Sequence, residues 1–213
     1  MRLTVTTFLT LDGVVQAPGA ANEDRSEGFE HGGWLVPYAD DDMGAAISDW
    51  FSQADAFLLG RRTYEIFAGH WPDVPDDNPV AAALNGLPKY VVSNTLAALS
   101  WQKSTLIGAN VVDEVANLKT QPGNELQVHG SSVLTRTLMA HNLVDEYRFL
   151  TYPVVLGTGR RLFEDPTKAA ALRLTDMKVT STGVVVATYQ PAGEPQHGSF
   201  ASAPEPDRHR ILR

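Results

Sequence analysis

One segment combines a glycine, two arginines and a threonine at the point where an apolar strand gives way to a helix. It reads Gly60-Arg61-Arg62-Thr63 and follows the apolar run 56–59. Glycine permits a tight turn, and the free N–H groups of a helix's first turn attract an anion. Guanidinium groups add forked donors that suit a phosphate. The segment predicts a phosphate site; the alternative is a helix capped by Thr63 beside two solvated arginines.

A second strand-to-helix junction carries small and hydroxylated residues. Gly130, Ser131 and Ser132 follow an apolar strand and open the next helix. Gly130 would let a pyrophosphate approach the backbone, and the two serines could donate hydroxyl groups. Ordinary N-capping by Ser131 would give the same pattern. Two such junctions in one chain favour a dinucleotide, because a dinucleotide lies across adjacent strand ends.

Two further strand ends offer polar or bare surface. Ser93-Asn94-Thr95 could contact a ribose or its 2′-phosphate, although an Asn-containing turn has the same sequence. Gly157 and Gly159 leave backbone without side chains, against which a flat ring could lie, or they form a flexible turn. Gly157-Thr158-Gly159 is only the first half of a G-x-G-x-x-G pattern, and Gly130-Ser131-Ser132 lacks the last glycine of a G-x-S-x-G elbow. A serine hydrolase is therefore not expected.

Composition excludes several classes of function. The chain has 213 residues, no cysteine and a formal net charge of −8. Disulfides, thiolate metal sites and cysteine nucleophiles are thereby excluded, and the histidines show no metal-binding spacing. The acidic balance, without a basic cluster, argues against nucleic acid or anionic membrane as a partner. No signal peptide or membrane-spanning run is seen, so we expect a cytoplasmic protein.

The elements that must position these residues alternate between strand and helix, which predicts an α/β fold with a mostly parallel sheet. A terminal pair of strands around the turn 181–183 predicts an antiparallel hairpin at one edge.

We expect one domain over 1–190, a long functional loop over 16–38, and a disordered tail over 191–213. The expected strands are 2–9, 56–59, 89–93, 105–107, 126–129, 146–152, 172–180 and 184–190; the expected helices are 42–54, capped by Asp41 or Asp42, 63–68, 80–85, 113–118 and 131–140.

Six segments, in order from residue 2 to about residue 190, resemble the dihydrofolate-reductase-like family. The resemblance is greatest to the reductase (C-terminal) domain of the bacterial bifunctional riboflavin-biosynthesis deaminase/reductase and its stand-alone relatives. The segments are Leu11-Asp12-Gly13, Gly60-Arg61-Arg62-Thr63-Tyr64-Glu65, Lys89-Tyr90-Val91-Val92-Ser93, Gly130-Ser131-Ser132, Val144-Asp145-Glu146-Tyr147 and Pro153-Val154-Val155-Leu156-Gly157-Thr158-Gly159.

This resemblance implies NADPH-dependent hydride transfer to a C=N or C=O group of a small pyrimidine- or pterin-like substrate. By position it implies that Arg61, Arg62, Thr63 and Ser93 meet the 2′-phosphate or pyrophosphate, with Asn94 and Thr95 beside them. It further implies that Gly130, Ser131 and Ser132 bind the pyrophosphate and that Gly157 and Gly159 border the nicotinamide. Asp12 would be the catalytic residue unless it is a simple turn residue, and Gly13, Trp34 and Trp50 would lie at the substrate. A homodimer is also implied.

One position departs from the dihydrofolate reductase pattern. Those enzymes place a carboxylate on the first helix, three residues before an aromatic pair, and here Ile47 holds that place before Trp50. Asp49 is one residue from Trp50 and should point elsewhere. An apolar side chain cannot hold a pterin, so folate reduction is doubtful. The alternatives are a true dihydrofolate reductase and a catalytically silent nucleotide-binding or oligomerisation module.

Overall fold

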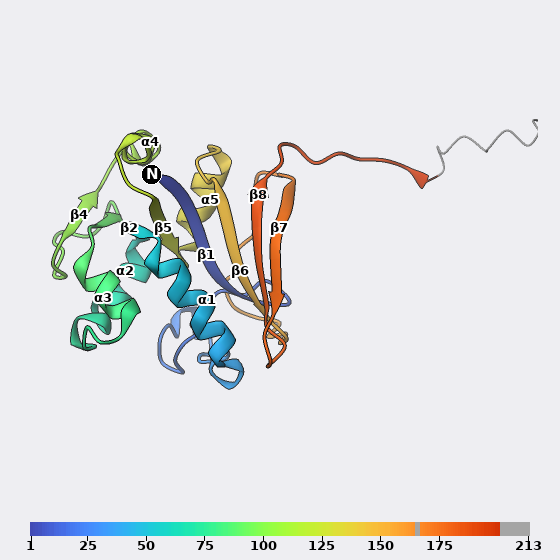
Figure 1. Cartoon of the computed structure of the whole chain (residues 1–213), viewed down its shortest axis with the longest axis horizontal. Helices are drawn as coiled ribbons and strands as arrows, with labels where there is room; N and C mark the ends of the chain where they lie inside the picture. The colour runs from blue at the N-terminus through green and yellow to red at the C-terminus, as the bar shows by residue number, and fades with distance from the viewer. Residues whose placement is uncertain (165–166, 201–213) are drawn as a thin grey trace, which may run out of the picture.

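The computed structural model describes residues 1–164 and 167–200, and an eight-stranded sheet forms its centre (Figure 1). The strand order is β4-β3-β2-β5-β1-β6-β8-β7. The strands are β1 (Arg2–Thr10), β2 (Ala54–Gly60), β3 (Lys89–Val92), β4 (Ser104–Ile107), β5 (Glu125–His129), β6 (Glu146–Tyr152), β7 (Leu172–Val179) and β8 (Val185–Pro191). The helices are α1 (Asp41–Ser52), α2 (Arg61–Ala68), α3 (Pro79–Gly86), α4 (Val111–Thr120) and α5 (Ser132–Ala140).

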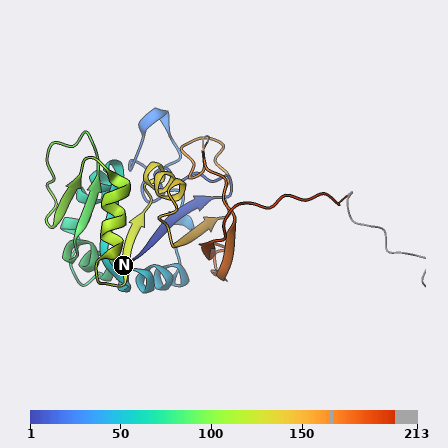
Figure 2. The same cartoon turned by 90° about the horizontal axis from the view of Figure 1, so that it is seen from above.

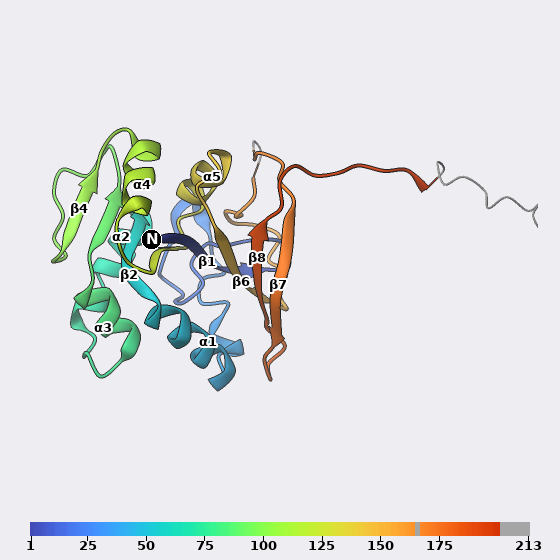
Figure 3. The ribbon, with the colours of Figure 1, turned by 45° about the horizontal axis from the view of Figure 1, so that its top comes forward.

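The predicted α/β class and strand directions are confirmed. Every pairing from β4 through to β6 is parallel. The terminal hairpin adds β8 antiparallel to β6, and β7 antiparallel to β8. The hairpin and β4 therefore form the two outer edges of the sheet (Figure 3).

Helices cover both faces of the parallel part of the sheet (Figure 2). On β2, Leu58 faces a core shared with α4 and α5, whereas Phe57 and Leu59 face a core shared with α1, α2 and α3. All three side chains have no exposed area. A strand buried on both faces reads as a continuous apolar run, which is why this segment was recognisable in the sequence.

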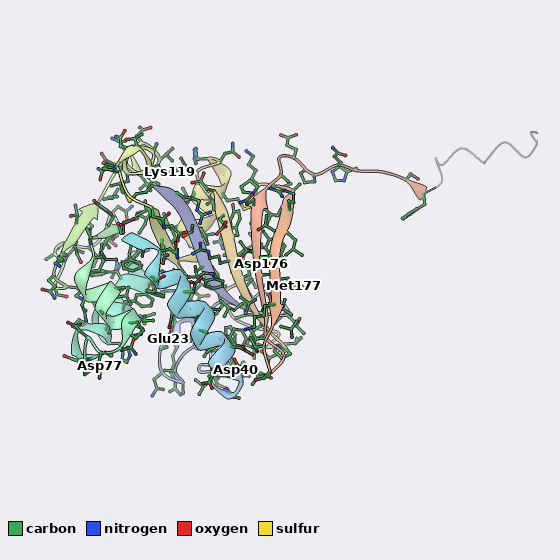
Figure 4. All side chains as sticks on the ribbon, viewed as in Figure 1. Glu23, Asp40, Asp77, Lys119, Asp176 and Met177 are labelled. Carbon is green, nitrogen blue, oxygen red and sulfur yellow. The ribbon has the colours of Figure 1, made fainter. Side chains whose placement is uncertain are left out.

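The start of α1 differs from the prediction. Asp40, one residue earlier than expected, caps the helix by accepting a hydrogen bond from the N–H of Met43 at 2.8 Å. Asp40 also accepts hydrogen bonds from the hydroxyl of Ser181 and the N–H of Thr182, at 2.7 and 3.1 Å. One carboxylate thus fastens α1 to the turn of the terminal hairpin, and Figure 4 labels Asp40 at this end of the helix.

The boundary of the predicted tail also moves. Pro191 lies in β8. The backbone pairing continues beyond it, because the Ala171 N–H donates to the Gly193 carbonyl and the Ala192 N–H donates to the Ala171 carbonyl, both at 2.8 Å. The ordered pairing therefore runs a few residues past 190. The part of the predicted tail over 201–213 lies outside the described residues.

Candidate functional site

The predicted site residues gather at the carboxyl edge of the parallel strands. Gly60 ends β2, Ser93 follows β3, Gly130 follows β5, and Asp12 follows β1. These four strands are consecutive neighbours in the sheet. Open α/β sheets bind ligands in the crevice at this edge, where helices begin and side chains from several strands converge.

The two strand-to-helix junctions are joined directly to each other. The Ser131 hydroxyl lies 3.0 Å from the Thr63 hydroxyl oxygen and donates to it, and the Ser131 N–H donates to the same oxygen at 3.2 Å. The Gly60 N–H donates to the Ser131 hydroxyl oxygen at 3.0 Å. Thr63 and Ser131 therefore hold the starts of α2 and α5 side by side.

Neither of these two side chains is an ordinary helix cap. No side chain caps the first turn of α2 or of α5, and Ser131 adopts a left-handed conformation with φ of 50°. The interpretation of Ser131 and Thr63 as simple N-caps is therefore wrong. The bridge uses the N–H groups of Gly60 and Ser131, and within the described residues no side chain accepts from the N–H groups of the first turns that follow, 61–63 in α2 and 132–134 in α5. That is the arrangement that binds phosphate groups.

The two arginines of the first junction point in different directions. The Arg61 guanidinium donates to the Thr95 hydroxyl at 2.6 Å, and Thr95 lies 3.4 Å from the Ser93 hydroxyl. Arg62 instead approaches Asp24 of the long loop, at 3.6 Å. Arg61, Ser93 and Thr95 thus form one polar cluster at the ends of β2 and β3. Asn94 is exposed beside them.

Asp12 is a clamp between two loops. Its carboxylate accepts hydrogen bonds from the Thr10 hydroxyl at 2.6 Å and from the N–H groups of Leu156 and Gly157 at 3.2 and 2.9 Å. Arg161 adds an ion pair at 3.2 Å. Partial burial acts to raise the pKa of Asp12, but the Thr10 and backbone hydrogen bonds outweigh it and hold that pKa well below its usual range. A carboxylate held in this way is a poor proton donor at neutral pH.

The two glycines beyond β6 have different surroundings. A side chain at Gly157 would meet open space, whereas one at Gly159 would strike the ring of Phe29. Both have positive φ, 76° and 100°. Only Gly157 therefore offers the bare surface expected of this segment. Gly13, also at positive φ, turns the chain after β1, and its carbonyl accepts the N–H of Leu162 at 2.9 Å.

The two tryptophans lie in the interior more than at the crevice. Trp34 is 7% exposed, donates to the Gln16 carbonyl at 2.8 Å, and packs edge-on against Tyr152 at 5.2 Å between ring centroids. Trp50 is partly buried, and its ring stands over the Arg148 guanidinium at 5.5 Å. Both help to shape the wall formed by α1 and the long loop.

A buried polar network beneath α1 was missed in the sequence. Gln127 donates to the Trp50 carbonyl at 2.5 Å and to Glu125 at 2.8 Å. Arg148 donates to both Glu125 and Glu146. The available signal was the alternation of Glu125, Gln127 and His129 along β5, which places three polar side chains on one face of an otherwise apolar sheet.

No group of three or more acidic or histidine side chains is arranged to hold a metal ion within 1–164 and 167–200. In the same part of the chain, no helix combines the length and apolar character needed to cross a membrane.

Several solved structures share this fold. A Shewanella sp. PV-4 protein provisionally named a riboflavin biosynthesis protein has a TM-score of 0.68 at 22% identity, over 90% of this chain and 99% of that one. Dihydrofolate reductase from Enterococcus faecalis complexed with NADP(H) has a TM-score of 0.58 at 13% identity, over 90% and 96%. The Thermotoga maritima diaminohydroxyphosphoribosylaminopyrimidine deaminase/5-amino-6-(5-phosphoribosylamino)uracil reductase has a TM-score of 0.59 at 13% identity, over 89% of this chain and 56% of that one. Likeness at these identities establishes the fold alone, and that fold is dihydrofolate-reductase-like.

Sequence comparison gives the family. The chain belongs to the family described as the RibD C-terminal domain, whose sequence model matches residues 2–187. One curated relative is the uncharacterized protein YyaP of Bacillus subtilis (strain 168), which is 29% identical over 191 residues, 88% of this chain and 94% of YyaP. The predicted resemblance is confirmed, and membership of this family supports an oxidoreductase of pyrimidine-reductase type.

Proposed function

We propose that this chain is an NADPH-dependent reductase that transfers a hydride to a C=N or C=O group of a small heterocycle, most closely a pyrimidine. The observation that carries the proposal is the bridge between Thr63 and Ser131, which sets two uncapped helix starts side by side. A single helix start suits one phosphate, whereas two adjacent ones suit a pyrophosphate.

The residues present fit this dinucleotide at three points. The first turns of α2 and α5 would hold the pyrophosphate. Arg61, with Ser93 and Thr95, would hold the 2′-phosphate that distinguishes NADPH from NADH, because these three polar side chains already lie in contact at the ends of β2 and β3. The open face of Gly157 would lie against the nicotinamide ring.

When bound, NADPH supplies the hydride; the residues of the chain provide binding, alignment and exclusion of water. Asp12 fixes the backbone at Leu156 and Gly157, and so determines the surface against which a flat ring would align. We propose water as the proton source, because the Asp12 carboxylate stays ionised. The long loop over 16–38 would cover the crevice and exclude bulk solvent.

The first helix argues against a pterin as the substrate. Ile47 packs into the apolar clusters on both sides of α1, and Asp49 is exposed to solvent. No carboxylate of α1 therefore reaches the crevice at the position where dihydrofolate reductases need one. We accordingly favour a pyrimidine over a folate.

The test is a titration of NADPH and NADH against the wild type, Arg61→Ala and Arg173→Ala. We expect wild type to prefer NADPH, and Arg61→Ala to lose about tenfold to hundredfold in affinity for NADPH alone. Arg173 is an exposed arginine on β7, which β6 and β8 separate from the strands that carry the site. The Arg173→Ala variant therefore controls for the loss of one positive charge. Equal affinity for NADH and NADPH, or no binding of either, would refute the cofactor assignment.

Turnover is measured separately from binding. NADPH oxidation would be followed with 5-amino-6-(5-phosphoribosylamino)uracil and, in parallel, with dihydrofolate. Reduction of the uracil compound supports the proposal, and reduction of dihydrofolate contradicts the argument from Ile47. Binding of NADPH without turnover of either compound would instead favour a silent nucleotide-binding module.

We also propose that the chain forms a homodimer through the hairpin edge. Leu174, Met177 and Val179 lie on one face of β7 and are between 48% and 56% exposed. Figure 4 labels Met177 and Asp176 on this outermost strand. Asp176 and Lys178 lie on the opposite face, since they pair with residues of β8 that face the other way. A second copy of the chain could bury the exposed apolar face of this edge strand.

A further inference from the structure

We propose that Asp24 of the long loop competes with a bound phosphate group for Arg62, so that the loop is tied across the crevice when the crevice is empty and is released on one side when an anion binds. The inference rests on the proposed function, because it assigns the second arginine of the first junction to control of the same crevice.

The carboxylate of Asp24 is held between two guanidinium groups. One of its oxygens accepts hydrogen bonds from the Ser26 N–H at 3.0 Å and the Ser26 hydroxyl at 2.6 Å. The other faces both Arg160 and Arg62. The Asp24 side chain is 9% exposed, so it is largely withdrawn from solvent.

These two contacts come from opposite sides of the crevice. Arg62 lies in the first turn of α2, which follows β2, whereas Arg160 lies beyond β6. In the sheet, β5 and β1 lie between β2 and β6, a separation of about 14 Å at the usual strand spacing. Asp24 therefore ties the loop to both sides of the edge where β5 and β1 end.

The two contacts are unequal. Arg160 donates to Asp24 and to the Ser26 hydroxyl at 2.8 Å, and its own N–H donates to Gln16 at 3.1 Å. Gln16 in turn donates to the carbonyls of Asp24 and Ser26, at 3.2 and 3.1 Å. This closed set of bonds, next to a cavity of about 420 Å³ between the loop and the segment 158–160, anchors Asp24 firmly on the β6 side.

The contact with Arg62 is the weak one. At 3.6 Å from its Nε to Asp24 it is longer than a hydrogen bond, and the Arg62 side chain is 52% exposed. Within the described residues, Asp24 is its one charged partner. A phosphate at the start of α2 carries more charge and more acceptors than a carboxylate, so it would take Arg62 from Asp24 and leave the anchor at Arg160 intact.

A double-mutant cycle tests the competition, with inorganic pyrophosphate as the probe. Its affinity is measured by calorimetry for wild type, Asp24→Asn, Arg62→Gln and the double variant. We expect Asp24→Asn to bind pyrophosphate about threefold to tenfold more tightly, and this gain to vanish when residue 62 is glutamine. Unchanged or weaker binding by Asp24→Asn, or an equal gain in the Arg62→Gln background, would overturn the proposal.

Hydrogen exchange of the amides over 20–28 gives a readout that needs no ligand. We expect faster exchange in Arg62→Gln, and faster still in Arg160→Gln, because Arg160 is the firmer anchor. Unchanged exchange in Arg62→Gln would overturn the tie across the crevice. If the affinity for pyrophosphate is the same with and without the Asp24 carboxylate, the competition is overturned and the proposed function stands. If none of the four proteins binds pyrophosphate, both the competition and the proposed function are overturned.

Discussion

At the scale of the residue, His129 makes stability depend on pH. Its imidazole stacks on Phe51 at 4.5 Å between ring centroids and lies 3.1 Å from the side-chain oxygen of Gln127. Burial, reinforced by the positive charge of Arg148, lowers the pKa of His129 from 6.5 to about 3. The folded protein therefore keeps this imidazole neutral in a range where the unfolded chain protonates it.

We expect the free energy of unfolding to fall as the pH falls below 6.5, because the unfolded state then binds the extra proton. The contribution of His129 is about 1.4 kcal/mol per pH unit and ends near the folded pKa of about 3. Urea unfolding at a series of pH values would measure it. His129→Gln should flatten the profile between pH 6.5 and about 5, above the range in which carboxylates take up protons, and His141→Gln is the matched control for removing an exposed histidine. A slope that survives in His129→Gln between pH 6.5 and about 5 would assign the pH dependence in that range to another group.

At the scale of the element, the bridge between α2 and α5 links stability to binding. Thr63→Val keeps the shape of the side chain but removes the oxygen that accepts two hydrogen bonds from Ser131. We expect a loss of about 1–3 kcal/mol in the free energy of unfolding, and weaker binding of NADPH, because the two helix starts are no longer aligned. Thermal unfolding and a fluorescence titration measure the two effects.

A matched control separates the bridge from the loss of any threonine hydroxyl. Among the described hydrogen bonds, the side-chain hydroxyl of Thr137 in α5 donates only to the Val133 carbonyl of its own helix. Thr137→Val should therefore leave NADPH affinity at the wild-type value. If it weakens binding as much as Thr63→Val does, the bridge has no special role.

The elements differ in how far they could be predicted. The apolar run at β2 and the alternation of β8 identify strands from local pattern alone, and the order of strands and helices then limits the topology. The direction of Arg61 and Arg62 could not be predicted, because it depends on Thr95 and Asp24, which are distant in sequence. The conformation of Ser131 could not be predicted either, since a serine before a helix is ordinarily its cap.

At the scale of the whole molecule, the exposed face of β7 should decide whether the chain is monomeric. Met177→Lys places a charge in the middle of the apolar face formed with Leu174 and Val179. We expect this variant to be a monomer by light scattering after size exclusion, while the wild type is a dimer, because the lysine would be desolvated in the interface without a partner. Asp176→Lys, on the opposite face of the same strand, should stay dimeric with an unchanged thermal midpoint. A wild type that is monomeric at every concentration measured would refute the dimer, and loss of the dimer in both variants would place the interface on the edge of β7 and not on its apolar face.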